Sequence, residues 1–177
     1  MMIIKECPFS EVRIFKFDGV NDNRGSKIRL YSAREFAECG IDFVPKEDVL
    51  YRIPRRNTLY GIHFQLEPHP QQKIIRLIEG SGIDYVIDLR KDSPTYKKWH
   101  SVELSAENQL HVFVPRGFGH LFRSTADNTL MIFSVDCDFD SGAQTVSFRD
   151  PEINLDICTS DIPFIMSAKD SAAPFLH

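Results

Sequence analysis

The sequence predicts an all-β fold, a sandwich or barrel with a few short peripheral helices. Short apolar or alternating runs recur along most of the 177 residues, clusters of turn-forming residues separate them, and only two stretches carry helix signals. This spacing is typical of β-sandwiches and barrels. The length suffices for one well-buried core, and no linker or internal repeat interrupts the pattern, so we predict a single domain over residues 1–177.

The predicted strands alternate with turn signals in chain order. Predicted turns at residues 21–25, 79–82, 91–94 and 140–142 are rich in Gly, Asn, Asp, Ser or Pro, which tolerate positive φ or close Asx turns. The predicted strands cover residues 12–17, 27–31, 49–53, 59–66, 73–79, 83–89, 100–104, 110–114, 120–124, 129–135 and 144–148.

Two helix signals lie outside these strands. Ser32 followed by Glu35 forms a capping box, and Gly40 can end the helix. Near the C-terminus, Ser167 and Asp170 repeat the capping pattern before a run of small residues. Both helices are expected to be short and peripheral.

Composition narrows the class of partner. The net charge of −4 leaves no basic stripe, which argues against nucleic acid and anionic membranes and favours a small ligand. The four cysteines form no C-x-x-C pair, so they predict neither a zinc knuckle nor a disulfide framework. The N-terminus has no signal-peptide pattern and no apolar run approaches the ~20 residues of a membrane span. We therefore expect a cytoplasmic protein with reduced thiols.

The strand around His63 is the first candidate pocket wall. Strict alternation would place Gly61, His63 and Gln65 on one face and Tyr60 with its alternating neighbours on the other. A glycine, an imidazole and an amide on one face suggest a ligand site. The alternative is a buried histidine satisfied by a cross-strand partner.

Residues 114–122 resemble the second cupin motif, in which Pro and Gly deliver a histidine, here His120, into a barrel. An ordinary hairpin whose His120 only packs is the alternative. A metal-binding cupin would also need His-x-His, but Gln65 occupies the second histidine position, and Glu67 and His69 lie in a proline-bounded loop. The sequence therefore predicts no metal and no other cofactor.

Acid–base chemistry remains available without metal, because a histidine oriented by a carboxylate is a competent base near neutral pH. Asp84 and Asp170 are the candidate carboxylates, although Asp170 could instead only cap a helical turn. Lys73 could stabilise an enolate oxygen, or it could be an ordinary surface lysine.

Taken together, the chain resembles the dTDP-4-dehydrorhamnose 3,5-epimerase family of sugar-nucleotide epimerases. The agreement runs in order through residues 23–25, 59–65, 73–76, 84–95, 99, 104–108, 115–122, 150–153 and 167–174. The resemblance implies a jelly-roll cupin, a homodimer with shared strands, no metal, and a 4-keto-6-deoxy sugar on a nucleoside diphosphate, as in deoxysugar and O-antigen biosynthesis.

The resemblance also implies residue roles. His63 corresponds to the general base, Asp170 to its carboxylate partner, and Lys73 to the cation near the C4 oxygen. The implied substrate-binding residues are Arg24, at a phosphate, with Tyr60, Gln65, Asp84, His120, Phe139 and Lys169.

The chain departs from the family at its phenols. Phe139 occupies the position of the family's tyrosine acid, and Phe133 that of a companion tyrosine. Either another group, such as Tyr51, Tyr60 or Cys137, supplies the proton, or exchange stops at one carbon, or turnover is lost. A non-catalytic sugar-nucleotide-binding cupin is therefore the alternative function.

The nucleotide side departs as well. The family commonly has Arg at position 60, Glu at 29, Gln at 48, Asn at 50 and an aromatic at 20. This chain has instead Tyr60, Arg29, Asp48, Leu50 and Val20. Loss of a phosphate-binding Arg predicts a changed sugar or base, or a pyrophosphate clamp shifted to Arg29 or Arg52.

Overall fold

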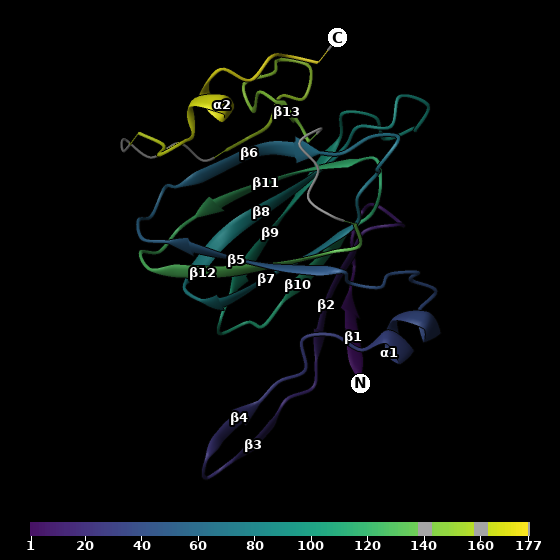
Figure 1. Cartoon of the computed structure of the whole chain (residues 1–177), viewed down its shortest axis with the longest axis vertical. Helices are drawn as coiled ribbons and strands as arrows, with labels where there is room; N and C mark the ends of the chain where they lie inside the picture. The colour runs from purple at the N-terminus through teal and green to yellow at the C-terminus, as the bar shows by residue number, and fades with distance from the viewer. Residues whose placement is uncertain (138–142, 158–162, 177) are drawn as a thin grey trace.

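The protein is built from two facing antiparallel sheets (Figure 1), described by a computed structural model over residues 1–137, 143–157 and 163–176. One sheet has six strands in the order β1-β2-β10-β7-β12-β5 and the other has five in the order β13-β6-β11-β8-β9. This arrangement confirms the all-β prediction.

The strands of the six-stranded sheet are β1 (Met2–Lys5), β2 (Arg13–Phe17), β5 (Glu47–Ile53), β7 (Lys73–Glu79), β10 (His111–Val114) and β12 (Thr129–Val135). Those of the five-stranded sheet are β6 (Leu59–Phe64), β8 (Ser81–Asp88), β9 (Trp99–Ser105), β11 (Phe118–Ser124) and β13 (Gln144–Val146). A hairpin of β3 (Val20–Asp22) and β4 (Gly25–Lys27) projects away from both sheets (Figure 1).

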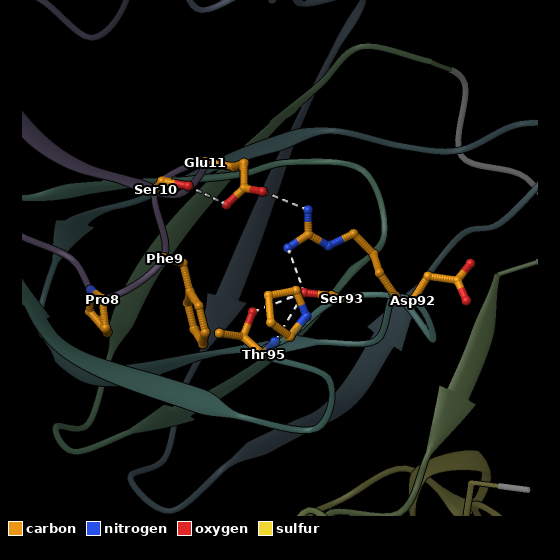
Figure 2. A pocket seen from close by; sticks show the side chains of 9 residues that line it. Pro8, Phe9, Ser10, Glu11, Asp92, Ser93 and Thr95 are labelled. Carbon is orange, nitrogen blue, oxygen red and sulfur yellow. Dashed lines mark hydrogen bonds and ion pairs between the residues drawn. The ribbon is translucent and has the colours of Figure 1, made fainter.

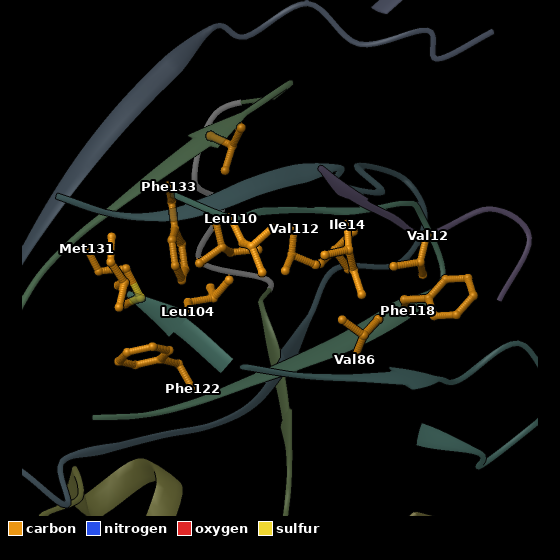
Figure 3. Close-up of a cluster of buried hydrophobic side chains, with 14 of the residues drawn as sticks. Val12, Ile14, Val86, Leu104, Leu110, Val112, Phe118, Phe122, Met131 and Phe133 are labelled. Atoms are coloured by element: carbon orange, nitrogen blue, oxygen red, sulfur yellow. The ribbon is translucent and has the colours of Figure 1, made fainter. Parts of the chain in front are cut away.

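The space between the sheets is filled by the central hydrophobic cluster. Both sheets contribute alternate side chains to it, such as Val86 and Phe122 from the five-stranded sheet and Val112 and Phe133 from the six-stranded sheet (Figure 3). Burial of this apolar surface is the main favourable term in folding. The polar side chains described below share this space between the sheets.

Each sheet is also covered on its outer face. The C-terminal segment lies over the five-stranded sheet, where Ile153 and Ile157 pack with Ile62 and Tyr85. Helix α1 (Ala33–Glu38) covers the six-stranded sheet, with Phe36 packed among Phe15, Phe17, Ile74 and Phe113. Strands β8 and β11 are therefore buried on both faces, which allows charged side chains to be held away from water.

Both predicted helix caps are present. The Ser32 hydroxyl accepts a hydrogen bond from the Glu35 backbone N–H of α1, and the Ser167 hydroxyl accepts one from the Asp170 backbone N–H of α2 (Ala168–Ser171). No helix in the described part of the chain is long and apolar enough to cross a membrane.

The strand predicted over residues 27–31 is wrong. The chain leaves the ladder after β4, and Tyr31 instead packs on Phe36 and donates its hydroxyl to the Phe43 carbonyl at 2.7 Å. Burial of one aromatic side chain thus overrides a local β pattern. Strands β1, β3 and β4 were not predicted, because they are short and are defined by pairing, β1 with β2 and β3 with β4.

The predicted turn at residues 79–82 is a corner at which the chain passes from one sheet to the other. Gly80 has φ of 78°, and a Cβ built on Gly82 would lie 2.2 Å from the buried Phe122 ring. We expect Gly82→Ala to destabilise the fold by about 1–3 kcal/mol, because a packed aromatic ring would have to move. Urea unfolding checks this, with Gly19→Ala as control, since a Cβ there meets nothing closer than 3.4 Å. An equal midpoint for both variants would contradict the assignment.

A surface cavity of about 420 Å³ lies between the N-terminal segment and the loop after β8 (Figure 2). Its walls are held by the buried Asp88, which accepts hydrogen bonds from Arg90, Ser93 and Thr95. Burial alone would raise the pKa of Asp88, but these bonds hold it well below its ordinary value. Arg90 also pairs with Glu11 (Figure 2), so this network ties the N-terminal segment to the loop after β8.

Candidate active site

His63 and Asp170 form a hydrogen-bonded pair although 107 positions separate them in sequence. His63 Nε2 lies 2.6 Å from Asp170 Oδ1, and the side chains are 31% and 4% exposed. His63 comes from β6 and Asp170 from α2, and Figure 1 shows α2 above β6. The Ser167 hydroxyl caps the Asp170 backbone N–H, and this capping does not prevent the Asp170 carboxylate from bonding His63.

The charge state of Asp170 determines which ring nitrogen can act as a base. Burial would raise the pKa of Asp170, but hydrogen bonds from His63, Ser167 and the Gly61 backbone N–H hold it below the ordinary value. An ionised carboxylate accepts a hydrogen bond from Nε2–H of His63, so the proton stays on Nε2. The Nδ1 lone pair of His63 is then available for proton abstraction.

A β-bulge in β6 corrects the predicted alternation around His63. Its partner β11 pairs His120 with His63 but Phe122 with Tyr60, so one extra residue of β6 is accommodated between these pairs. As a result Tyr60 faces the space between the sheets together with His63, where it packs edge-on against Tyr51 at 5.3 Å. Gly61 in the bulge faces Asp170, and a Cβ there would lie 3.1 Å from Asp170 Oδ1.

A second histidine–carboxylate pair lies deeper between the sheets. His120 Nε2 is 2.5 Å from Asp84 Oδ2, and both side chains are almost fully buried. Asp84 therefore orients His120 and not His63. Burial raises the pKa of Asp84 and lowers that of His120, since both charged forms are desolvated.

Lys73 approaches from the opposite sheet, on β7. It is 5% exposed, so the surface-lysine alternative is excluded. Burial lowers the pKa of Lys73 to about 8, while the charges of Asp84 and Cys137 oppose this shift. Within the described residues its ammonium makes no hydrogen bond, so its donors remain available to a ligand oxygen.

Gln65 and Cys137 lie at the end of the site beyond Lys73. Gln65 is 5% exposed, and its Nε2 donates to the His69 carbonyl at 3.1 Å and contacts Cys137 Sγ at 3.8 Å. The Gln65 Oε1 atom is buried and has no hydrogen-bond partner among the described residues. The thiols of Cys7, Cys39 and Cys137 are free.

Two predicted substrate-binding residues lie apart from this group within one chain. Arg24 lies at the tip of the β3–β4 hairpin, 84% exposed, and pairs with Asp22 at 2.6 Å. The exposed Lys169 donates to the Ala143 carbonyl at 3.0 Å. Phe139 and Cys158 lie outside the described residues. Phe133 is described, and its ring packs against His120 at 5.2 Å.

The sequence did not identify every polar group near the pair. Thr145 on β13 pairs across from His63, and its hydroxyl lies 3.5 Å from Asp170 Oδ1. Gln71 Nε2 lies 3.8 Å from Cys137 Sγ, the same thiol that Gln65 contacts. No local pattern marks either residue, because their proximity arises only from strand pairing. In the described parts of the chain, no three His, Cys, Asp or Glu side chains are grouped as metal ligands.

Facing jelly-roll sheets that hold ionisable side chains between them define a cupin-type enzyme, and comparison with known proteins places it further. The dTDP-4-dehydrorhamnose 3,5-epimerase family matches residues 6–177. The chain belongs to that family, and its enzymatic class is carbohydrate epimerase.

Individual relatives agree along nearly the whole chain. The dTDP-4-dehydrorhamnose 3,5-epimerase of Salmonella typhimurium is 30% identical over 99% of this chain and 96% of its own. A crystal structure of the Bacillus anthracis enzyme with TDP and PPi bound superimposes with a TM-score of 0.94 at 29% identity, covering 99% of this chain and 100% of that one. A 3'-monoepimerase from Streptomyces bikiniensis in complex with dTDP-quinovose has a TM-score of 0.87 at 26% identity, covering 95% and 86%.

Proposed function

We propose that the protein epimerises a 4-keto-6-deoxy sugar carried on a nucleoside diphosphate, at C3, at C5 or at both. The observation that carries the proposal is the 2.6 Å contact of His63 with the buried Asp170, which orients the imidazole as a base, while Lys73 is buried on β7 of the facing sheet. The family's epimerases, including the 3'-monoepimerase, support this substrate class.

The chemistry needs a base and a cation at fixed positions. A proton on the carbon next to the C4 ketone is acidic only because the carbonyl oxygen can take the negative charge. In this proposal His63 removes that proton and Lys73 stabilises the enolate oxygen. Returning a proton to the other face of the carbon inverts its configuration.

We further propose that the working form is a homodimer in the cytoplasm. Arg24 is exposed on the β3–β4 hairpin, which lies far from β6 of its own chain (Figure 1), and this suits a contact with a phosphate bound to a second copy. Arg29, a predicted pyrophosphate ligand, already pairs with Glu35. Arg52 on β5 remains exposed and is the better candidate for a shifted clamp.

Deuterium incorporation tests the function directly. The protein is incubated in D₂O with dTDP-4-keto-6-deoxyglucose and with its UDP and GDP counterparts, and label is read by NMR at C3 and C5. We expect label and inverted product with at least one nucleotide, and label at one carbon only would identify a mono-epimerase. Saturable binding of these sugars without label would identify a non-catalytic sugar-nucleotide-binding protein and overturn the proposal.

A further inference from the structure

The thiol of Cys137 lies near the buried Lys73, close enough for its charge to act on the Lys73 ammonium. Cys137 follows β12, whose Val135 pairs with Lys73 of β7, and Asp136 between Val135 and Cys137 is bonded to Gln72. Its Sγ is 3.8 Å from the amide nitrogens of both Gln65 and Gln71. The thiol is partly exposed and free.

Two unpartnered polar groups lie around this thiol. The ammonium of Lys73 and the Oε1 atom of Gln65 are each on side chains 5% exposed, and neither has a hydrogen-bond partner among the described residues. Buried polar groups are normally satisfied. A donor and an acceptor left open beside one thiol are what a bound polyhydroxylated ligand would fill.

Cys137 and His63 approach this space from opposite sheets. His63 lies on β6 of the five-stranded sheet, whereas Cys137 follows β12 of the six-stranded sheet, and Figure 1 shows these two strands on opposite sides of the sandwich. A sugar carbon between them would expose one face to the imidazole and the other to the thiol. Inversion requires this arrangement, because one group removes a proton and another must return one to the opposite face.

We propose that Cys137 is the proton donor that completes inversion, a role that rests on the proposed function. The enolate carbon takes the proton from sulfur, so that a C–H bond forms, the S–H bond breaks and a thiolate remains beside Lys73 and the two amides. His63 keeps the abstracted proton until both groups exchange with solvent. Thiols are stronger acids than phenols, with ordinary pKa values of about 8.5 and about 10, so the transfer is chemically reasonable.

The neighbouring phenols are less well placed for this role. Tyr60 comes from the same strand as His63. Burial raises the pKa of Tyr60, and the charge of Asp170 raises it further, so Tyr60 lies on the same side of the site as the base. Tyr51 comes from the opposite sheet, but after burial its pKa is raised by Tyr60 and Glu47, and its ring packs on Phe133. Of these three residues, only Cys137 contributes to the charge environment of Lys73.

The test separates exchange from inversion. Cys137→Ser keeps an acceptor for both glutamine amides but replaces the thiol by a much weaker acid, and Cys137→Ala removes the donor. With a keto sugar that the unmodified protein labels in D₂O, we expect both variants to retain exchange within a few-fold, because His63 can return deuterium to the same face. Inverted product should fall about 100-fold or more. Cys39→Ser at the end of α1 is the matched control and should invert normally.

Several outcomes would overturn the assignment. Inversion at the unmodified rate in folded Cys137→Ala excludes the thiol as donor, and so does loss of inversion in Tyr51→Phe or Tyr60→Phe alone. Loss of exchange together with inversion in Cys137→Ala would assign the thiol to enolisation instead. Absence of label with the unmodified protein refutes the proposed function itself, and it is therefore distinguishable from failure of the cysteine assignment.

Discussion

His63→Ala is expected to reduce solvent exchange and product formation by about 10³-fold while the fold remains intact. General-base catalysis contributes about 10²–10⁴-fold, and the removed imidazole is the group that Asp170 orients at 2.6 Å. Deuterium incorporation under single-turnover conditions measures the loss. Because His63 is 31% exposed, its truncation removes little core packing, and the circular dichroism spectrum should remain that of a folded protein.

Asp170→Asn sharpens the assignment of the pair. An amide can donate to Nε2 of His63, which favours the tautomer with its proton on Nδ1 and removes the free lone pair. A loss similar to that of His63→Ala, and no further loss in the double variant, would show that the two act as one unit. His100→Ala on β9 is the control and should retain full activity. Undiminished exchange in His63→Ala would refute the role of this histidine.

Lys73→Met is expected to reduce turnover by about 10²–10³-fold, because the proposed mechanism uses the buried ammonium of Lys73 to stabilise the enolate oxygen. The same residue predicts a pH limit. Burial lowers the pKa of Lys73 to about 8, so its ammonium is retained below this pH and lost above it. The rate of exchange should therefore fall as the pH rises through about 8, since only the protonated amine stabilises the enolate.

Two variants test this limit. Lys73→Arg keeps a positive charge, and the pKa of an arginine side chain lies far above pH 8. The fall in exchange rate near pH 8 should therefore disappear, even if the overall rate is lower. Lys91→Met, in the loop after β8, is the control and should leave the pH profile unchanged. If the exchange rate of Lys73→Arg still falls at the same pH, the alkaline fall would belong to a group other than Lys73.

The burial of Lys73 shows where prediction from sequence ended. The bounds of β7 and β12 agree with the predicted strands at residues 73–79 and 129–135, because periodicity and flanking turns are local properties. Which face of β7 meets the other sheet is a property of the packed barrel. The sequence thus allowed both a surface and a buried lysine at position 73.

For the site as well, the sequence named the residues, and the fold decided which of them pair. Family resemblance named His63, Asp170, Lys73 and His120, and residue chemistry made Asp84 a second candidate to orient His63. Folding decided between the carboxylates by bringing α2 over β6 and leaving Asp84 bonded to His120. Contacts across 107 positions depend on chain topology, which no local spacing encodes.

Alone, the sequence determined the all-β class, most strand positions, both helix caps and the family. Tertiary structure decided the bulge that turns Tyr60 toward His63, the choice of Asp170 as its partner, and the position of Cys137 beside Lys73. The physical reason is that hydrophobic periodicity and capping act within a few residues, whereas register, bulges and charge pairing are set by which surfaces are buried together.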